Sequence, residues 1–93
     1  MIFAIYATDK PDILETRMAA RQAHLDYIEP YNDKILTAGP RLSDDGEKMI
    51  GSLIVIDLPD RAAVDAFCKN DPYAIAGIFA DVKVTGYRPV FPK

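Results

Sequence analysis

The centre of the fold is indicated by residues 35–58, which read ILTAGPRLSDDGEKMIGSLIVIDL. Ile35–Gly39 and Met49–Leu58 are short apolar runs of the kind that form buried strands. The turn cluster 43–47 between them contains Asp45-Gly46, and glycine tolerates the positive φ angle that tight hairpin turns need. This stretch therefore predicts two antiparallel strands joined as a hairpin.

The segments on either side of the hairpin each predict one strand and one helix. Residues 2–7 form a β-branched and aromatic strand, and residues 12–31 form a long helix that Thr8, Asp9 or Asp12 is expected to cap and that ends near Pro30. Its expected buried stripe, from helical spacing, consists of Leu14, Met18, Leu25 and Ile28. The segments after the hairpin are a helix over 61–69 opened by Pro59-Asp60, a helical turn through Ile75, a strand over 79–88 and an extended tail over 89–93.

The resulting order, β-α-β-β-α-β, predicts an α+β fold. Two β-α-β crossovers around a central hairpin give a four-stranded antiparallel sheet with both helices on one face. The length of 93 residues is enough for one domain, 1–93, and too short for two.

Composition excludes several classes of protein. Apolar residues make up 49% of the chain and charged residues 27%, which is typical of a globular domain. The net charge is −3 and the basic residues are scattered, so nucleic-acid binding is not expected. No apolar run approaches the roughly 20 residues of a membrane span, so no membrane association is expected and we expect a cytoplasmic protein. The single cysteine, Cys68, is expected to be a buried apolar group.

Both faces of the predicted sheet are apolar. Along the first strand, Phe3, Ile5 and Ala7 alternate with Ile2, Ala4 and Tyr6; along the third, Leu53 and Val55 alternate with Ile50, Ile54 and Ile56. The helices can cover one face, and soluble monomers avoid a large exposed apolar patch. We therefore expect a homodimer that pairs through the sheet faces, with coverage by the tail and loops as the alternative.

One histidine, His24, is the first candidate for chemistry. It lies beside the apolar stripe of the long helix, together with Arg17, Arg21, Tyr27 and Tyr31. Histidine is the side chain best suited to proton transfer near neutral pH, although a lone helical histidine is more often packed or solvated. One histidine and one distant cysteine make no usual zinc ligand set, so no metal is expected.

The second candidate is Asp71, in Asp71-Pro72-Tyr73. Aspartate followed by proline is a good helix N-cap, which alone would explain the residue. If the two helices lie side by side, the Asp71 carboxylate could instead face His24 and orient its imidazole. Gly51-Ser52 within a strand indicates a bulge or a close approach of another group, and Ser52 could hydrogen-bond a ligand.

In these fragments the chain resembles the YCII-related family of the dimeric α+β barrel superfamily. The resemblance covers nearly all residues and is carried, in order, by Arg21-Gln22-Ala23-His24-Leu25, Tyr27, Ala38-Gly39-Pro40, Asp45-Gly46, Gly51-Ser52 and Asp71-Pro72-Tyr73. It implies a ferredoxin-like fold, two sheets packed into a barrel, and a pocket with a histidine–aspartate pair at His24 and Asp71. One relative eliminates chloride from a chlorinated hydroxyquinol, and superfamily cousins isomerise lactones or oxidise polyketides without metal or flavin.

The leading hypothesis is a cofactor-independent enzyme of the lyase or isomerase type, acting on a small hydroxylated or cyclic organic molecule. His24 would be the acid or base and Asp71 would hold its tautomer. Arg21 would neutralise oxyanion charge, while Ser52 and Tyr73 would position the substrate. The alternatives are a non-catalytic dimer that binds or senses a small molecule, and a domain that contributes only a dimer interface.

Overall fold

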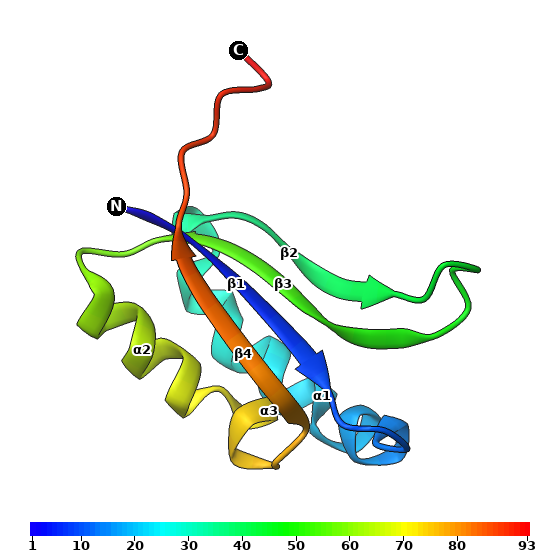
Figure 1. Ribbon diagram of the computed structural model, residues 1–93. Coiled ribbons are helices and arrows are strands. Elements are labelled where there is room, and N and C mark those ends of the chain that lie inside the picture. The colour runs from blue at the N-terminus through cyan, green and yellow to red at the C-terminus, as the bar shows by residue number, and fades with distance from the viewer.

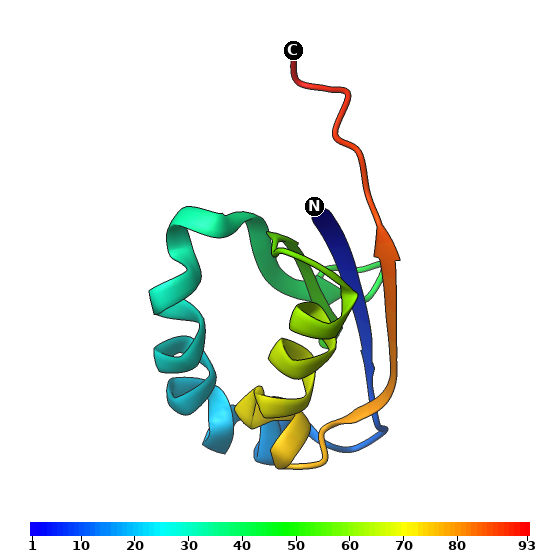
Figure 2. The same ribbon diagram turned by 90° about the vertical axis from the view of Figure 1, so that its left-hand side faces the viewer.

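The computed structural model describes residues 1–93, as one sheet covered by helices on one side (Figures 1 and 2). Its elements are β1 (Ile2–Asp9), α1 (Leu14–Ile28), the 3-10 helix η1 (Glu29–Lys34), β2 (Ile35–Leu42), β3 (Met49–Asp57), α2 (Arg61–Asn70), α3 (Pro72–Ile75) and β4 (Phe79–Gly86). The strands are ordered β2-β3-β1-β4 and all neighbours are antiparallel. The predicted ferredoxin-like α+β fold is confirmed.

The core lies between the central strands and α2. The register pairs Phe3 with Ile56 and Ile5 with Ile54, and these side chains are buried on the helix side of the sheet. Val64 and Phe67 of α2 pack into the same cluster. The Asp60 carboxylate caps α2 by accepting the Ala63 N–H at 2.8 Å, and the helix begins at Arg61, where the sequence predicted its start.

The start and end of α1 differ from the prediction. Asp12 has a φ of +56° and lies outside the helix, and Ile13 at the N-cap makes no side-chain hydrogen bond, so neither Thr8, Asp9 nor Asp12 caps α1. Helical structure continues beyond Ile28 as η1, with Pro30 in its first turn. Proline has no N–H to continue the α-helical pattern, which accounts for the change to a 3-10 helix here.

The predicted buried stripe of α1 is wrong for most of its members. Leu14 and Met18 are 56% and 51% exposed, and Leu25 is also exposed. The inward side instead carries buried Arg17, with half-buried His24 beyond it; only Ile28 of the stripe packs against the core. The inward face therefore lies to one side of the apolar stripe and includes polar groups.

The strands also differ at their ends. β2 runs to Leu42 where Gly39 was expected to end it, and Pro40 is accommodated because β2 is an edge strand that needs no second ladder of hydrogen bonds. A side-chain carbon at Gly51 would clash with the Ala7 carbonyl and with the Arg41 guanidinium, which donates to that carbonyl at 2.8 Å. The close approach predicted at Gly51 is therefore confirmed.

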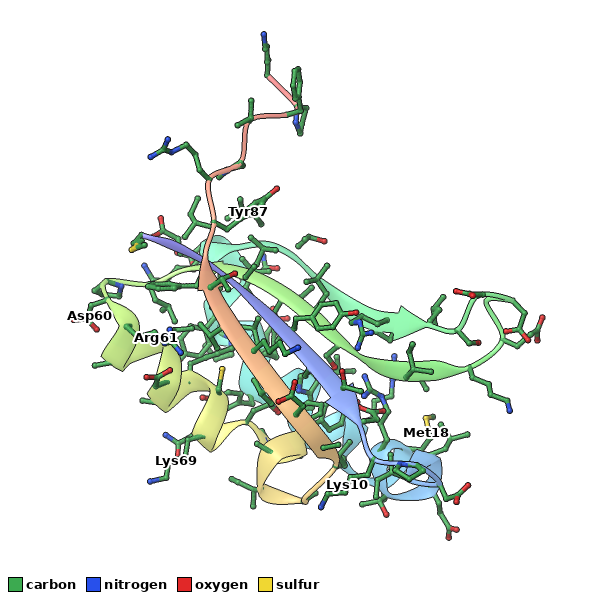
Figure 3. All side chains as sticks on the ribbon, viewed as in Figure 1. Lys10, Met18, Asp60, Arg61, Lys69 and Tyr87 are labelled. Atoms are coloured by element: carbon green, nitrogen blue, oxygen red, sulfur yellow. The ribbon has the colours of Figure 1, made fainter.

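The second face of the sheet is not covered by this chain. The register places Tyr6 opposite Leu53 on that face, where the two residues are 45% and 37% exposed. The tail leaves the sheet at Tyr87 and extends away from the domain (Figure 3), so its Val90 and Phe91 are exposed. Coverage by the tail, the alternative weighed from the sequence, is therefore wrong for the single chain.

Candidate active site

His24 and Asp71 are hydrogen-bonded, although 47 positions separate them in the chain. His24 Nδ1 lies 2.8 Å from Asp71 Oδ1, and the two side chains are 13% and 5% exposed. An ionised carboxylate can only accept, so Nδ1 carries the proton in this bond. The opposite nitrogen, Nε2, has no partner in the chain and remains accessible to solvent.

Asp71 is positioned by the short helix that follows it. Its Oδ1 also accepts the Tyr73 N–H at 2.9 Å, as an N-cap residue does, and Pro72 occupies the first turn of α3. The N-cap interpretation is thus correct, and it coexists with the contact to His24. The same oxygen links the start of α3 to the middle of α1.

Tyr73 holds the plane of the imidazole. Its ring is stacked on His24 with centroids 3.9 Å apart and an angle of 7° between the planes. The Arg17 guanidinium carbon lies 4.7 Å from the centre of the same tyrosine ring. Burial raises the pKa of Tyr73, against the lowering effect of the Arg17 charge, so its phenol stays protonated at neutral pH.

A buried ion pair beside this stack was not predicted from the sequence. Arg17 Nη1 donates to both carboxylate oxygens of Asp9 at 2.9 Å, and Arg17 Nη2 donates to Ser52 Oγ at 3.0 Å. The signal was present, because Arg17 and His24 are seven residues apart and so share one face of α1. Nothing in the sequence indicates Asp9 as the partner, because an aspartate between a strand and a helix is typical of a helix cap.

These groups surround a cavity of about 510 Å³ between α1 and β2, a volume that suits a small molecule. Its polar lining includes Arg17, Arg21, His24, Ser52 and Tyr73, so every predicted ligand-facing residue lies at this one cavity and Asp71 lies behind His24. The apolar lining comes from α1, β2 and β3 and comprises Leu25, Ile28, Ile35, Leu36, Ala38, Pro40, Met49 and Ile54.

No three His, Cys, Asp or Glu side chains come close enough together to hold a metal ion. Burial raises the pKa of the one thiol, Cys68, to about 11, so it is protonated at neutral pH. None of the helices is both long and apolar enough to cross a membrane.

The sheet covered by helices on one side and the His24–Asp71 pair at a cavity are features that the resemblance to the YCII-related family implies. The model of the YCII-related domain matches residues 1–88. The protein YciI of Escherichia coli O6:H1 is 35% identical over 98 aligned positions, which cover 98% of this chain and 100% of that protein. An uncharacterised protein of Haemophilus influenzae is 34% identical with the same coverage. The chain belongs to the YCII-related family.

Solved structures agree with this assignment. The dehydrochlorinase TftG of Burkholderia phenoliruptrix, which acts on 5-chloro-2-hydroxyhydroquinone and was solved with 2,5-dihydroxybenzoquinone, is 36% identical with a TM-score of 0.88. The match covers 95% of this chain and 94% of that one. An antibiotic biosynthesis monooxygenase homologue of Nitrosomonas europaea, at 19% identity, 98% and 90% coverage and a TM-score of 0.55, shares the fold alone.

Proposed function

We propose that this protein is a cofactor-independent enzyme that carries out lyase-type or isomerase-type proton transfer on a small hydroxylated or cyclic organic molecule. The observation that carries the proposal is the 2.8 Å bond between His24 Nδ1 and Asp71, at a cavity that the His24 side chain lines. With the proton held on Nδ1, the Nε2 lone pair can remove a proton from a bound molecule. The imidazole can carry out this proton removal without help from a metal or an organic cofactor.

Each neighbouring group has a role in this proposal. Asp71 fixes the tautomer and stabilises the imidazolium that forms when Nε2 takes a proton. Tyr73 keeps the ring plane directed at the cavity through the 3.9 Å stack. Arg21 neutralises negative charge that develops on a substrate oxygen, and Ser52, whose oxygen already accepts from Arg17, positions the substrate with its own hydroxyl proton.

The similarity to TftG supports an elimination as the reaction type. In a dehydrochlorination, a base removes a proton, the electron pair forms a new double bond, and chloride departs with its bonding electrons. A single base beside an open cavity is sufficient for the proton removal. Isomerisation requires the same base followed by return of the proton to another atom, so both reactions fit His24.

The experiment compares turnover and binding in the parent, in His24→Gln and in Asp71→Asn. Asparagine caps helices as well as aspartate, so the second variant keeps α3 while removing the charge. With 5-chloro-2-hydroxyhydroquinone and other halogenated or hydroxylated rings as substrates, His24→Gln should lower the rate about 10²–10⁴-fold. Binding of 2,5-dihydroxybenzoquinone should be retained. Asp26→Asn, at an exposed position of α1, is the matched control and should react at the parent rate.

An unchanged rate in His24→Gln would refute the catalytic role. The alternative function is a dimer that binds or senses a small molecule, which the open cavity also favours. Ligand binding by the parent without turnover of any compound in the set would support that alternative.

We further propose that two copies pair through the exposed sheet faces around Tyr6 and Leu53, since nothing in the chain covers this apolar surface.

A further inference from the structure

The ionisable side chains that line the cavity include basic groups and no carboxylate. Its ionisable lining consists of Arg17, Arg21, His24 and the neutral phenol of Tyr73, and no aspartate or glutamate is among the lining residues. The whole chain, in contrast, has 14 acidic and 11 basic residues. A cavity without carboxylates in an acidic protein favours ligands of negative charge over neutral or positive ones.

Two of the three basic groups already have acidic partners. Arg17 is neutralised by both oxygens of Asp9, and His24 is bonded to Asp71. Arg21 takes part in none of the ion pairs of the chain and is exposed at the cavity. The Arg21 guanidinium is therefore the cavity's positive charge without a counter-ion.

The spacing of Arg21 and His24 limits the size of the ligand. They are three residues apart on α1, so their β-carbons are neighbours about 5–6 Å apart on the helix surface. Both side chains line the same cavity, so an anion paired with Arg21 lies in the cavity that also contains the His24 ring. The apolar side chains of Leu25, Ile28 and Ile54 line the same cavity and can cover the carbon skeleton.

We infer that the cavity binds a small cyclic organic anion, a carboxylate, phenolate or enolate, whose charged oxygen pairs with Arg21 while its ring lies beside His24. This names the substrate class of the proposed active site and rests on the proposed function for what happens next. The recognition itself depends on charge and shape, so it can be tested by binding alone.

The test is calorimetric titration of the full chain with salicylate and salicylamide, which have the same ring and hydroxyl but differ in charge at pH 7. The parent should bind salicylate at least about tenfold more tightly, which corresponds to about 1.4 kcal/mol. Arg21→Gln should lose most of this preference, and Arg21→Lys should keep part of it. The matched control is Arg61→Gln, an exposed arginine at the start of α2 (Figure 3), which should retain the preference. Added salt should weaken the preference, because Arg21 is exposed.

Several results would overturn the inference. These are equal affinity for the two compounds, no binding of salicylate, or an unchanged preference in Arg21→Gln. If inorganic phosphate binds as tightly as salicylate, the site recognises negative charge alone and not the ring, which also contradicts the inference. The outcome is separable from the proposed function: an anion preference with normal turnover in His24→Gln would refute only the catalytic role. Equal affinity of the parent for salicylate and salicylamide, together with loss of turnover in His24→Gln, would refute only this inference.

Discussion

Asp9 and Arg17 show how a single polar contact supports the candidate site. Both side chains are almost fully buried, and their attraction must offset the loss of hydration of two charges. The geometry meets that requirement in part, since both Asp9 oxygens accept from Arg17 and Ser52 accepts as well, while Arg17 Nε has no partner. The pair joins the end of β1 to the first turns of α1 and holds Arg17 against Tyr73.

At this scale we predict that Asp9→Asn destabilises the protein strongly. The variant leaves the Arg17 charge buried with a neutral partner, which costs about 3–5 kcal/mol when one member of a buried pair is lost. Urea denaturation followed by circular dichroism measures the free energy of unfolding. Asp65→Asn, which breaks the exposed pair with Arg61, is the control and should cost no more than about 0.5 kcal/mol. Similar losses in both variants would contradict the role given to burial.

At the scale of elements, α1 is the helix whose orientation matters for function. It is anchored to α2 by Tyr27, whose hydroxyl donates to the Phe67 carbonyl at 2.9 Å. Phe67 lies in the last turn of α2, where carbonyls have no partner within the helix, so the bond satisfies an otherwise free acceptor. The rings of Tyr27 and Phe67 are also in contact, with centroids 5.4 Å apart. This contact fixes the far end of α1, opposite its anchor at Asp9.

We predict that Tyr27→Phe costs about 1 kcal/mol at neutral pH, because it removes one hydrogen bond and little volume. Burial and the neighbouring Tyr31 raise the pKa of Tyr27 from 10.0 to about 12. The unfolded chain therefore loses this proton first, so the contribution of Tyr27 is complete below pH 10 and is lost as the pH rises through 12. Urea denaturation at a series of pH values should show the parent approaching the variant over this range. A constant difference between the two would contradict this assignment.

At the scale of the whole molecule, the uncovered sheet face is the main feature without a partner. All helices lie on the other side of the sheet (Figure 2), and the tail extends away from it (Figure 1). A domain of this size buries only about 60–65% of the surface that its unfolded chain exposes, so its core is marginal alone. Covering Tyr6 and Leu53 with a second copy would add apolar burial at roughly 25 cal/mol per Å².

We predict a dimer in solution, with twice the 10.3 kDa mass of the chain in sedimentation equilibrium. Leu53→Asp should shift the protein to monomer, because it places a charge at the centre of the proposed interface. Ile75→Asp, at a residue of α3 that is 73% exposed, is the control and should remain dimeric. If Leu53→Asp does not fold, the oligomeric state is decided by measuring the Tm of the parent at several protein concentrations. The Tm of a dimer rises with protein concentration. A parent of monomeric mass with a constant Tm would contradict the proposal.

The amino-acid sequence by itself determined the order of strands and helices and the residues at which most of them begin. The Asp45-Gly46 turn, the Asp60 and Asp71 caps and the alternation in β1 depend on residues that are close together in the chain. Such local preferences act whatever the rest of the molecule does. The candidate residues could also be named in advance, because few histidines, caps and strand glycines exist in so short a chain.

Only the tertiary structure decided which side of α1 faces inward and that His24 meets Asp71. Leu14 and Met18 have the spacing of a buried stripe, yet the ion pair of Arg17 with Asp9 and the bond of His24 with Asp71 turn another face inward. These contacts join residues eight and 47 positions apart, and their distances depend on how helices and strands pack. Periodicity along one helix contains no information about such partners, because it describes spacing within the helix and not what lies across from it.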